Sequence, residues 1–280
     1  MQTKKVLKVL KKNPLFTICL VIILLFILVA VFAPVLSKYD PYAQNLLDSN
    51  APPSAEHLLG TDALGRDLLT RLMYGARVSL TVCLTSSLMG LLMGTTLGLI
   101  SGYVNGIIGG FIMRANDALM SIPGLITAMV MSIHASGNLL FLAFVIAFTT
   151  MPTYIRIVYG QVLSLRENDY VAASKLLGSN MFEILIRHIL PNCFGVLIVT
   201  FTMSLGNTIL IEETMSYVGL GIKPPTPAWG VMVSEGYSCI WNNPALALIP
   251  GLCVVLMVVA FNVAGDGLRD LLDPRLRGKV

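Results

Sequence analysis

The sequence predicts an all-α integral membrane protein with six transmembrane helices and both termini in the cytoplasm. Of its 280 residues, 55% are hydrophobic and 12% are charged, and the mean hydropathy is +0.79. About a quarter of the residues in soluble domains are charged, so a soluble fold is excluded. Two further observations support this class: long uncharged stretches recur along the chain, and the basic residues between them are unevenly distributed.

The uncharged stretches set the number of spans, because a helix needs about 20 apolar residues to cross a bilayer. They cover residues 15–36, 78–113, 118–155, 192–211 and 242–265. The third is too long for one crossing and contains a turn-like sequence at 135–138, so it predicts two spans. The second ends in a glycine-rich sequence that predicts a break and a short interfacial helix. The expected spans are therefore about 15–36, 78–101, 117–134, 139–158, 195–215 and 245–265.

The basic residues orient these spans. With both termini inside, 14 Lys and Arg residues fall on the cytoplasmic side and five on the outer side, as the positive-inside rule requires. Their dispersal among apolar segments excludes a nucleic-acid surface. Two outer segments, 37–77 and about 216–244, are long and rich in Pro and Gly. Residues 63–72 alternate apolar and charged positions, which predicts a helix lying on the outer membrane surface.

We divide the chain into two parts on this basis. Residues 1–77 hold the N-terminal tail, the first span and the outer segment, and residues 78–280 hold a five-helix core. The first span is preceded by a basic stretch, as in a signal peptide, but no small-residue cleavage site comes after it. We therefore expect the span to remain as an anchor.

Few ionisable side chains fall inside the expected spans, whereas ion-coupled transporters usually keep such groups there. The exceptions lie near span ends, where we expect interfacial solvation: Asp117, His134 and the pair Glu212 and Glu213. The driving force for any transport is therefore expected to come from elsewhere.

No nucleotide, catalytic or metal site is expected in this chain. The segment 60–65 has the glycine spacing of a phosphate loop, but Arg66 and Asp67 stand where Lys and Ser or Thr are required. The five cysteines are isolated and are expected to be packing residues. They are Cys19, Cys83, Cys193, Cys239 and Cys253. The substrate path stays unassigned.

A glycine recurs at every fourth position along the second span and predicts close helix packing, because small residues let two backbones approach in lipid. The packing helix can belong to the same bundle or to another subunit. The residues concerned are Gly90, Gly94, Gly98 and Gly102.

The inner segment 161–191 is too long for a simple connector and predicts a hairpin of two short helices. Residue 168 or 169 can cap the first helix, which we expect to stop at Gly178. Asn180 begins a capping-box pattern for the second, which we expect Pro191 to end. Small residues beside two leucines suit a helix that seats in another protein's groove. A solvated amphipathic loop would show the same pattern.

The sequence of this hairpin resembles a family signature. Tyr170-Val-Ala-Ala-Ser-Lys-Leu-Leu-Gly-Ser-Asn180, followed by Arg187-His-Ile-Leu-Pro-Asn192, is similar to the signature of permease subunits of binding-protein-dependent ATP-binding-cassette (ABC) importers. There a Glu-Ala-Ala segment precedes a Gly and a Leu-Pro at fixed spacings, and Gly178 and Pro191 match in register. Ala172 replaces the family Glu and Ser174 the second Ala.

Two more stretches resemble the peptide/nickel branch of that family, which His188 also matches. They are residues 57–67 with 75–80, and residues 216–221 with 224–230. The resemblance covers nearly the whole chain and identifies it as a second-type permease of a dipeptide/oligopeptide/nickel importer.

The resemblance implies the type I ABC importer permease fold, a multi-pass location in a bacterial or archaeal plasma membrane, and half of a path for peptides, nickel or a nickel chelate. Implied partners are a paralogous permease, two cytoplasmic ATPases that hold ATP and Mg²⁺, an extracytoplasmic solute-binding protein and membrane lipid. The subunit itself is not expected to be an enzyme. The residues implied in ATPase coupling are Tyr170, Val171, Ala172, Ala173, Ser174, Lys175, Leu176, Leu177, Gly178, His188 and Pro191.

Two other function classes remain open from the residues alone. The first is an ion-coupled secondary transporter or channel that works without an ATPase, which the scarcity of intramembrane charges disfavours. The second is a membrane receptor or assembly scaffold that transports nothing.

Overall fold

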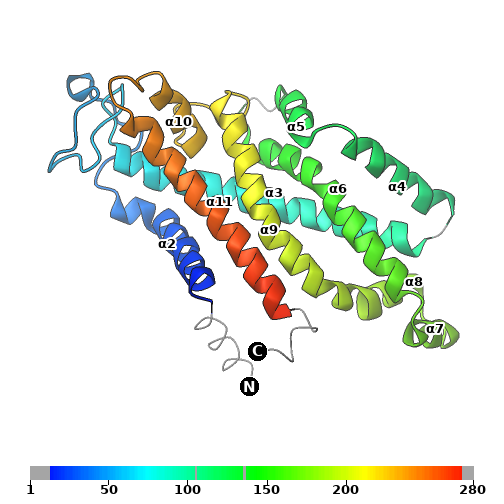
Figure 1. Ribbon diagram of the computed structural model, residues 1–280. Helices are drawn as coiled ribbons and strands as arrows, with labels where there is room; N and C mark the ends of the chain where they lie inside the picture. The colour runs from blue at the N-terminus through cyan, green and yellow to red at the C-terminus, as the bar shows by residue number, and fades with distance from the viewer. Residues whose placement is uncertain (1–12, 105, 135–136, 273–280) are drawn as a thin grey trace.

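The computed structural model describes residues 13–104, 106–134 and 137–272, which form a bundle of helices (Figure 1). These residues contain no β-strand, and an isolated bridge joins Thr61 to Asp67. The long helices are α2 (Pro14–Leu36), α3 (Leu68–Tyr103), α6 (Leu139–Leu165), α9 (Leu190–Tyr217) and α11 (Ala245–Leu272). The short elements are η1 (Leu46–Asp48), α4 (Ile107–Met120), α5 (Gly124–Ser132), α7 (Asp169–Leu176), α8 (Met181–Ile184), the π-helical turn η2 (Leu185–Ile189) and α10 (Trp229–Tyr237).

The long helices pack side by side, with α3 between α2, α6 and α9, and with α11 against α2, α9 and α10. Among the described residues, five helical segments are long and apolar enough to cross a membrane, and one of them joins α8, η2 and α9. Five of the six expected spans lie within these segments.

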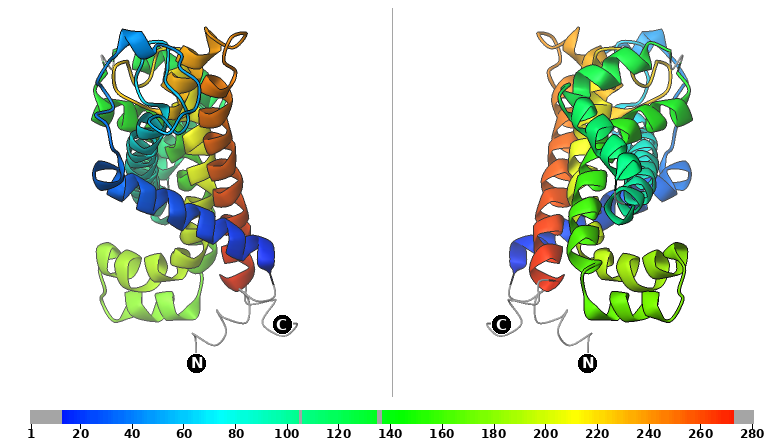
Figure 2. Two further views of the ribbon diagram at one scale, coloured as in Figure 1. Left: turned by 90° about the vertical axis from the view of Figure 1, so that its left-hand side faces the viewer. Right: turned by 90° about the vertical axis from the view of Figure 1, so that its right-hand side faces the viewer.

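The two ends of the bundle carry different elements (Figure 2). We call one the α7 end, because it holds α7, the start of α2 and the end of α11. The other, the α10 end, holds α10 and the segment 37–67. The described chain ends thus lie on the same side as the hairpin, as expected. That this side faces the cytoplasm stays a prediction.

The expected third span, 117–134, is not one helix. Helix α4 ends at Met120, and α5 begins at Gly124 after a break that contains Pro123. A proline disfavours helical backbone in the residue before it, here Ile122, which explains the break. Both short helices pack on α6, so this part of the chain is a broken helix pair.

The glycines of the second span lie against α6. A Cβ at Gly94 would stand 2.5 Å from Tyr154 Cβ, and one at Gly98 would stand 2.7 Å from Val158 Cβ. Gly90 and Gly102 face α6 in the same way. The glycines therefore serve packing within the bundle, and α3 and α6 approach to backbone contact.

The segment 37–67 contains one short helix, η1, and no helix on the membrane surface. Leu68 instead begins α3, because the side chain of Asp67 caps the new helix by accepting a hydrogen bond from Thr70 N at 2.8 Å. The expectation of a surface helix at 63–72 was wrong. The alternation of charged and apolar residues there has a different cause, described below.

Candidate functional site

The hairpin at the α7 end is the candidate site, and its first helix is closed by local hydrogen bonds. Helix α7 stops where Gly178 adopts φ +86°, a left-handed conformation that glycine tolerates best. Ser179 N donates to Ser174 O at 3.1 Å and Gly178 N to Lys175 O at 3.0 Å. This pair of bonds is a Schellman motif, so the predicted stop at Gly178 has a direct structural cause.

The second helix begins as expected but does not stop. Asn180 Oδ1 accepts from Glu183 N at 2.9 Å, and the helix then runs through η2 into α9. Leu190 N donates to Leu185 O across the π turn, which places Pro191 in the first turn of α9, where a missing N–H is tolerated. Pro191 therefore does not end the helix, and the hairpin is continuous with a membrane-spanning segment.

One face of α7 is buried against the bundle, and the side chains on its other face are exposed. Val171 is fully buried among apolar residues of η2 and the neighbouring helices, and Ser174 is buried beside it. On the other face Leu176 and Leu177 are 90% and 87% exposed. Ala172, Ala173, Lys175 and Gly178 are also exposed, and His188 is half-buried.

Side chains on three helices hold the hairpin in place. Lys175 Nζ lies 5.1 Å from the ring centroid of Tyr103 at the end of α3, close enough for a cation–π contact. Tyr170 and His188 face each other at 6.1 Å between ring centroids. Arg166, which follows α6, donates to Gly102 O at 3.1 Å. The hairpin is thus attached to α3 and α9, and α6 is tied to α3 beside it.

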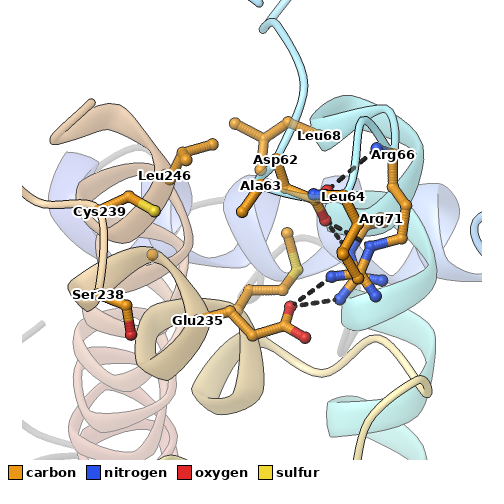
Figure 3. A pocket seen from close by; sticks show the side chains of 12 residues that line it. Asp62, Ala63, Leu64, Arg66, Leu68, Arg71, Glu235, Ser238, Cys239 and Leu246 are labelled. Carbon is orange, nitrogen blue, oxygen red and sulfur yellow. Dashed lines mark hydrogen bonds and ion pairs between the residues drawn. The ribbon is translucent and has the colours of Figure 1, made fainter. Parts of the chain in front are cut away.

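A second polar cluster lies at the α10 end (Figure 3). Arg66 donates to Asp62 Oδ2 at 2.6 Å and to Glu235 Oε2 at 2.9 Å, and Arg71 donates to the same Glu235 oxygen at 2.8 Å. These four residues, the four-charge ring, border a cavity of about 290 Å³. Both arginines are almost fully buried, which is tolerable because each charge is paired.

The ring explains the charged and apolar alternation at 63–72. Arg66 and Arg71 turn inward to Glu235 on α10, and Asp67 caps α3 and pairs with His57. Spacing predicts contact between Asp62 and Arg66, but Glu235 is distant in sequence and only the fold brings it near. The adjacent Gly60 and Gly65 pack against backbone oxygens of Ala51 and Asn45 and belong to the same compact segment.

The residues expected to be solvated at span ends divide into two groups. Asp117 is 57% exposed and pairs with Arg156 at 2.5 Å, and His134 is exposed. Glu212 and Glu213 are instead buried, at 0% and 5% exposure. The expectation for this pair was wrong, because α10 folds back and covers this part of α9.

No metal site is found in the described part of the chain, where no three His, Cys, Asp or Glu side chains gather as ligands. Cys19, Cys83 and Cys193 are buried and unpaired, and Cys239 and Cys253 are half-buried.

Two family models match the chain. Residues 94–278 match the binding-protein-dependent transport system inner membrane component, and residues 2–53 match the N-terminal transmembrane domain of oligopeptide transport permease C.

Relatives and a solved structure agree with these matches. The chain is 38% identical to the oligopeptide transport system permease protein OppC of Bacillus subtilis, over 95% of this chain and 88% of that protein. It is 39% identical to the dipeptide transport system permease protein DppC of Alkalihalophilus pseudofirmus, over 98% and 90%. The inward-facing methionine ABC transporter MetNI superposes with a TM-score of 0.59 at 18% identity, covering 74% of this chain and 98% of that one.

Proposed function

Because this chain belongs to the family of binding-protein-dependent transport system inner membrane components, we propose that it forms half of a peptide path and that α7 couples this path to an ATPase. The chain is a membrane permease subunit of the ABC importer class that takes up peptides, and its fold is that of a type I importer permease. The observation that carries the coupling proposal is the pair Leu176 and Leu177, exposed on a helix whose other face is buried.

Two exposed leucines suit a protein groove because burying apolar surface contributes about 25 cal/mol per Å². The family resemblance favours an ATPase as the partner, since the leucines lie within the matched hairpin. Ala172 leaves the helix without the family carboxylate, so we expect the contact in this protein to be mainly apolar. The 14 to five distribution of basic residues supports a cytoplasmic location for the α7 end.

The attachments of the hairpin support mechanical coupling. Because α7 is joined to α3 and α9, a displacement of α7 by the ATPase would move those helices together, as in other two-state transport elements. We further propose that a paralogous permease completes the path and that a solute-binding protein delivers the substrate. The relatives named for oligopeptides and dipeptides favour peptides over nickel.

The test replaces one exposed leucine with aspartate at each end of the bundle. L176D puts a charge on the proposed docking face, whereas L47D makes the same change at Leu47, which is 95% exposed at the α10 end. In the complex purified with its ATPases, we expect L176D to lose ATPase co-purification and peptide uptake, and L47D to retain both. Equal uptake and co-purification in the two variants would refute the docking proposal.

A second variant tests the hairpin geometry. Gly178 is exposed and its φ is +86°, so G178V strains the turn by about 1 kcal/mol without a steric clash. We expect ATP hydrolysis that no longer drives uptake. A cysteine cross-link from residue 176 to the ATPase, compared between G178V and the parent complex, separates loss of docking from loss of coupling.

A further inference from the structure

Two acidic side chains are buried inside a membrane-spanning segment of this permease. Glu212 and Glu213 lie near the α10 end of α9, within the apolar stretch Met181–Tyr217. Both are buried because α9 is covered by α3, α10 and α11. Ionised groups at such positions are costly and are usually compensated by a partner.

One oxygen of each carboxyl group is already occupied. Ile222 N donates to Ser216 Oγ at 3.1 Å, and Ser216 Oγ in turn donates to Glu212 Oε1 at 2.9 Å. Gly230 N, in the first turn of α10, donates to Glu213 Oε2. A Cβ at Gly230 would lie 2.8 Å from that oxygen, so the glycine allows this close approach.

The remaining oxygens form a cluster without partners. Glu212 Oε2, Glu213 Oε1 and Ser79 Oγ of α3 are all buried, and none has a hydrogen bond in the described structure. Ser79 is fully buried and lies close enough to both carboxyl groups to act on them electrostatically, as they do on each other. The cluster therefore contains two carboxyl oxygens and one hydroxyl group, and the hydroxyl proton of Ser79 has no other acceptor among the described residues.

No cation in the described residues compensates the pair. The ion pairs of this structure join other side chains. The titratable side chains of neighbouring helices that come within electrostatic reach of the pair are the thiols of Cys83 on α3 and Cys253 on α11. Neither thiol supplies a positive charge.

We propose that Ser79, Glu212 and Glu213 form a binding site for one proton, held between Glu212 Oε2 and Glu213 Oε1. Two adjacent carboxylates in a site shielded from water cannot both be ionised. The proton resides mainly on Glu212, because Glu213 accepts the Gly230 N–H at the N-terminus of α10, where negative charge is stabilised. The donor to Glu212 is instead a neutral hydroxyl, that of Ser216, away from any helix N-terminus. Ser79 completes the site as a donor to the charged carboxylate. This inference does not depend on ATPase coupling.

The bound proton reduces electrostatic repulsion at the place where three helices meet. It cancels one of two like charges at the contact of α3, α9 and α10, and so allows the segment 218–230 to remain packed on α9. Loss of the proton would leave two adjacent negative charges there and favour separation of α10 from α9.

Infrared spectroscopy of the purified full-length chain in lipid nanodiscs tests the site. At neutral pH we expect a carbonyl stretching band from a protonated carboxylic acid, with the intensity of one group. E212Q should abolish the band while its amide N–H still donates to Glu213. The control E183Q, at a half-exposed ion pair at the α7 end, should leave the band intact.

The stability of two matched variants tests the assignment of the proton. We expect E212Q to keep the parent Tm and E213Q to lower it, because only Glu213 carries the charge that caps α10. No band in the parent chain, or an equal band in E212Q, would overturn the proposal. A missing band together with a Tm that rises in sodium chloride but not in choline chloride would show that a metal cation occupies the site instead.

Discussion

Replacing Gly94 with alanine tests whether α3 and α6 are held together at backbone contact. The new Cβ would lie 2.5 Å from Tyr154 Cβ and 2.7 Å from Met151 O, whereas carbon atoms in contact are normally about 3.5–4.0 Å apart. Neither atom is at the flexible end of a side chain, so the helices must separate by about 1 Å. Overpacking of this kind costs about 1–3 kcal/mol. At roughly 2–4 °C per kcal/mol, we expect the Tm of G94A to fall by about 2–12 °C.

Variants at Gly160 and Gly90 provide the comparison for this expectation. Gly160 on α6 has open space at its Cβ position, so G160A should gain helix propensity of up to about 1 kcal/mol and lose nothing. At Gly90 the close atom is Thr150 Oγ1, at 2.5 Å, so T150A should restore part of the stability that G90A loses. Thermal unfolding followed by circular dichroism in one detergent measures all of them. Equal Tm values for G94A and G160A would refute the close contact.

Three further predictions concern the α10 end and the exposed surface. E235A should destabilise the chain by about 1–3 kcal/mol, because two buried guanidinium groups lose a partner; chemical unfolding measures this, and a parent-like midpoint would contradict it. D117N should change stability by less than about 1 kcal/mol in the same assay, because both side chains of its ion pair are more than half exposed. Trp229 is fully buried and Trp241 is 96% exposed, so W241F should leave tryptophan fluorescence that acrylamide quenches poorly, whereas strong quenching would show that α10 is not packed as described.

The positions of most long helices follow from hydropathy because each carries a long apolar run with few charges. Helix α2 begins one residue before its expected span and ends with it, and α6 and α11 each extend seven residues beyond theirs at the C-terminal end. Hydropathy cannot place the break at Pro123, since the residues around it are as apolar as those of an uninterrupted span. The local signals at Asn180 and Gly178 are read correctly because both act within a single turn of chain.

The buried charges could not be found in this way, because burial depends on partners far away in sequence. Arg66 and Arg71 look like surface residues until Glu235 is brought beside them. Glu212 and Glu213 look interfacial until α10 folds over them. In each case the sequence shows the charge but not the fold that covers it.

The chain stays helical from α8 through η2 into α9, so a movement of the hairpin can be transmitted to the far end of α9. Helix α9 itself has 28 residues, which correspond to about 42 Å at 1.5 Å per residue, and α8 and η2 meet it at an angle (Figure 2). If α9 tilts by about 10° about the point where it meets η2, its far tip, and the acidic pair near it, move through about 7 Å. A small angular stroke at one membrane surface would thus be amplified into a displacement wide enough to open or shut a passage at the other.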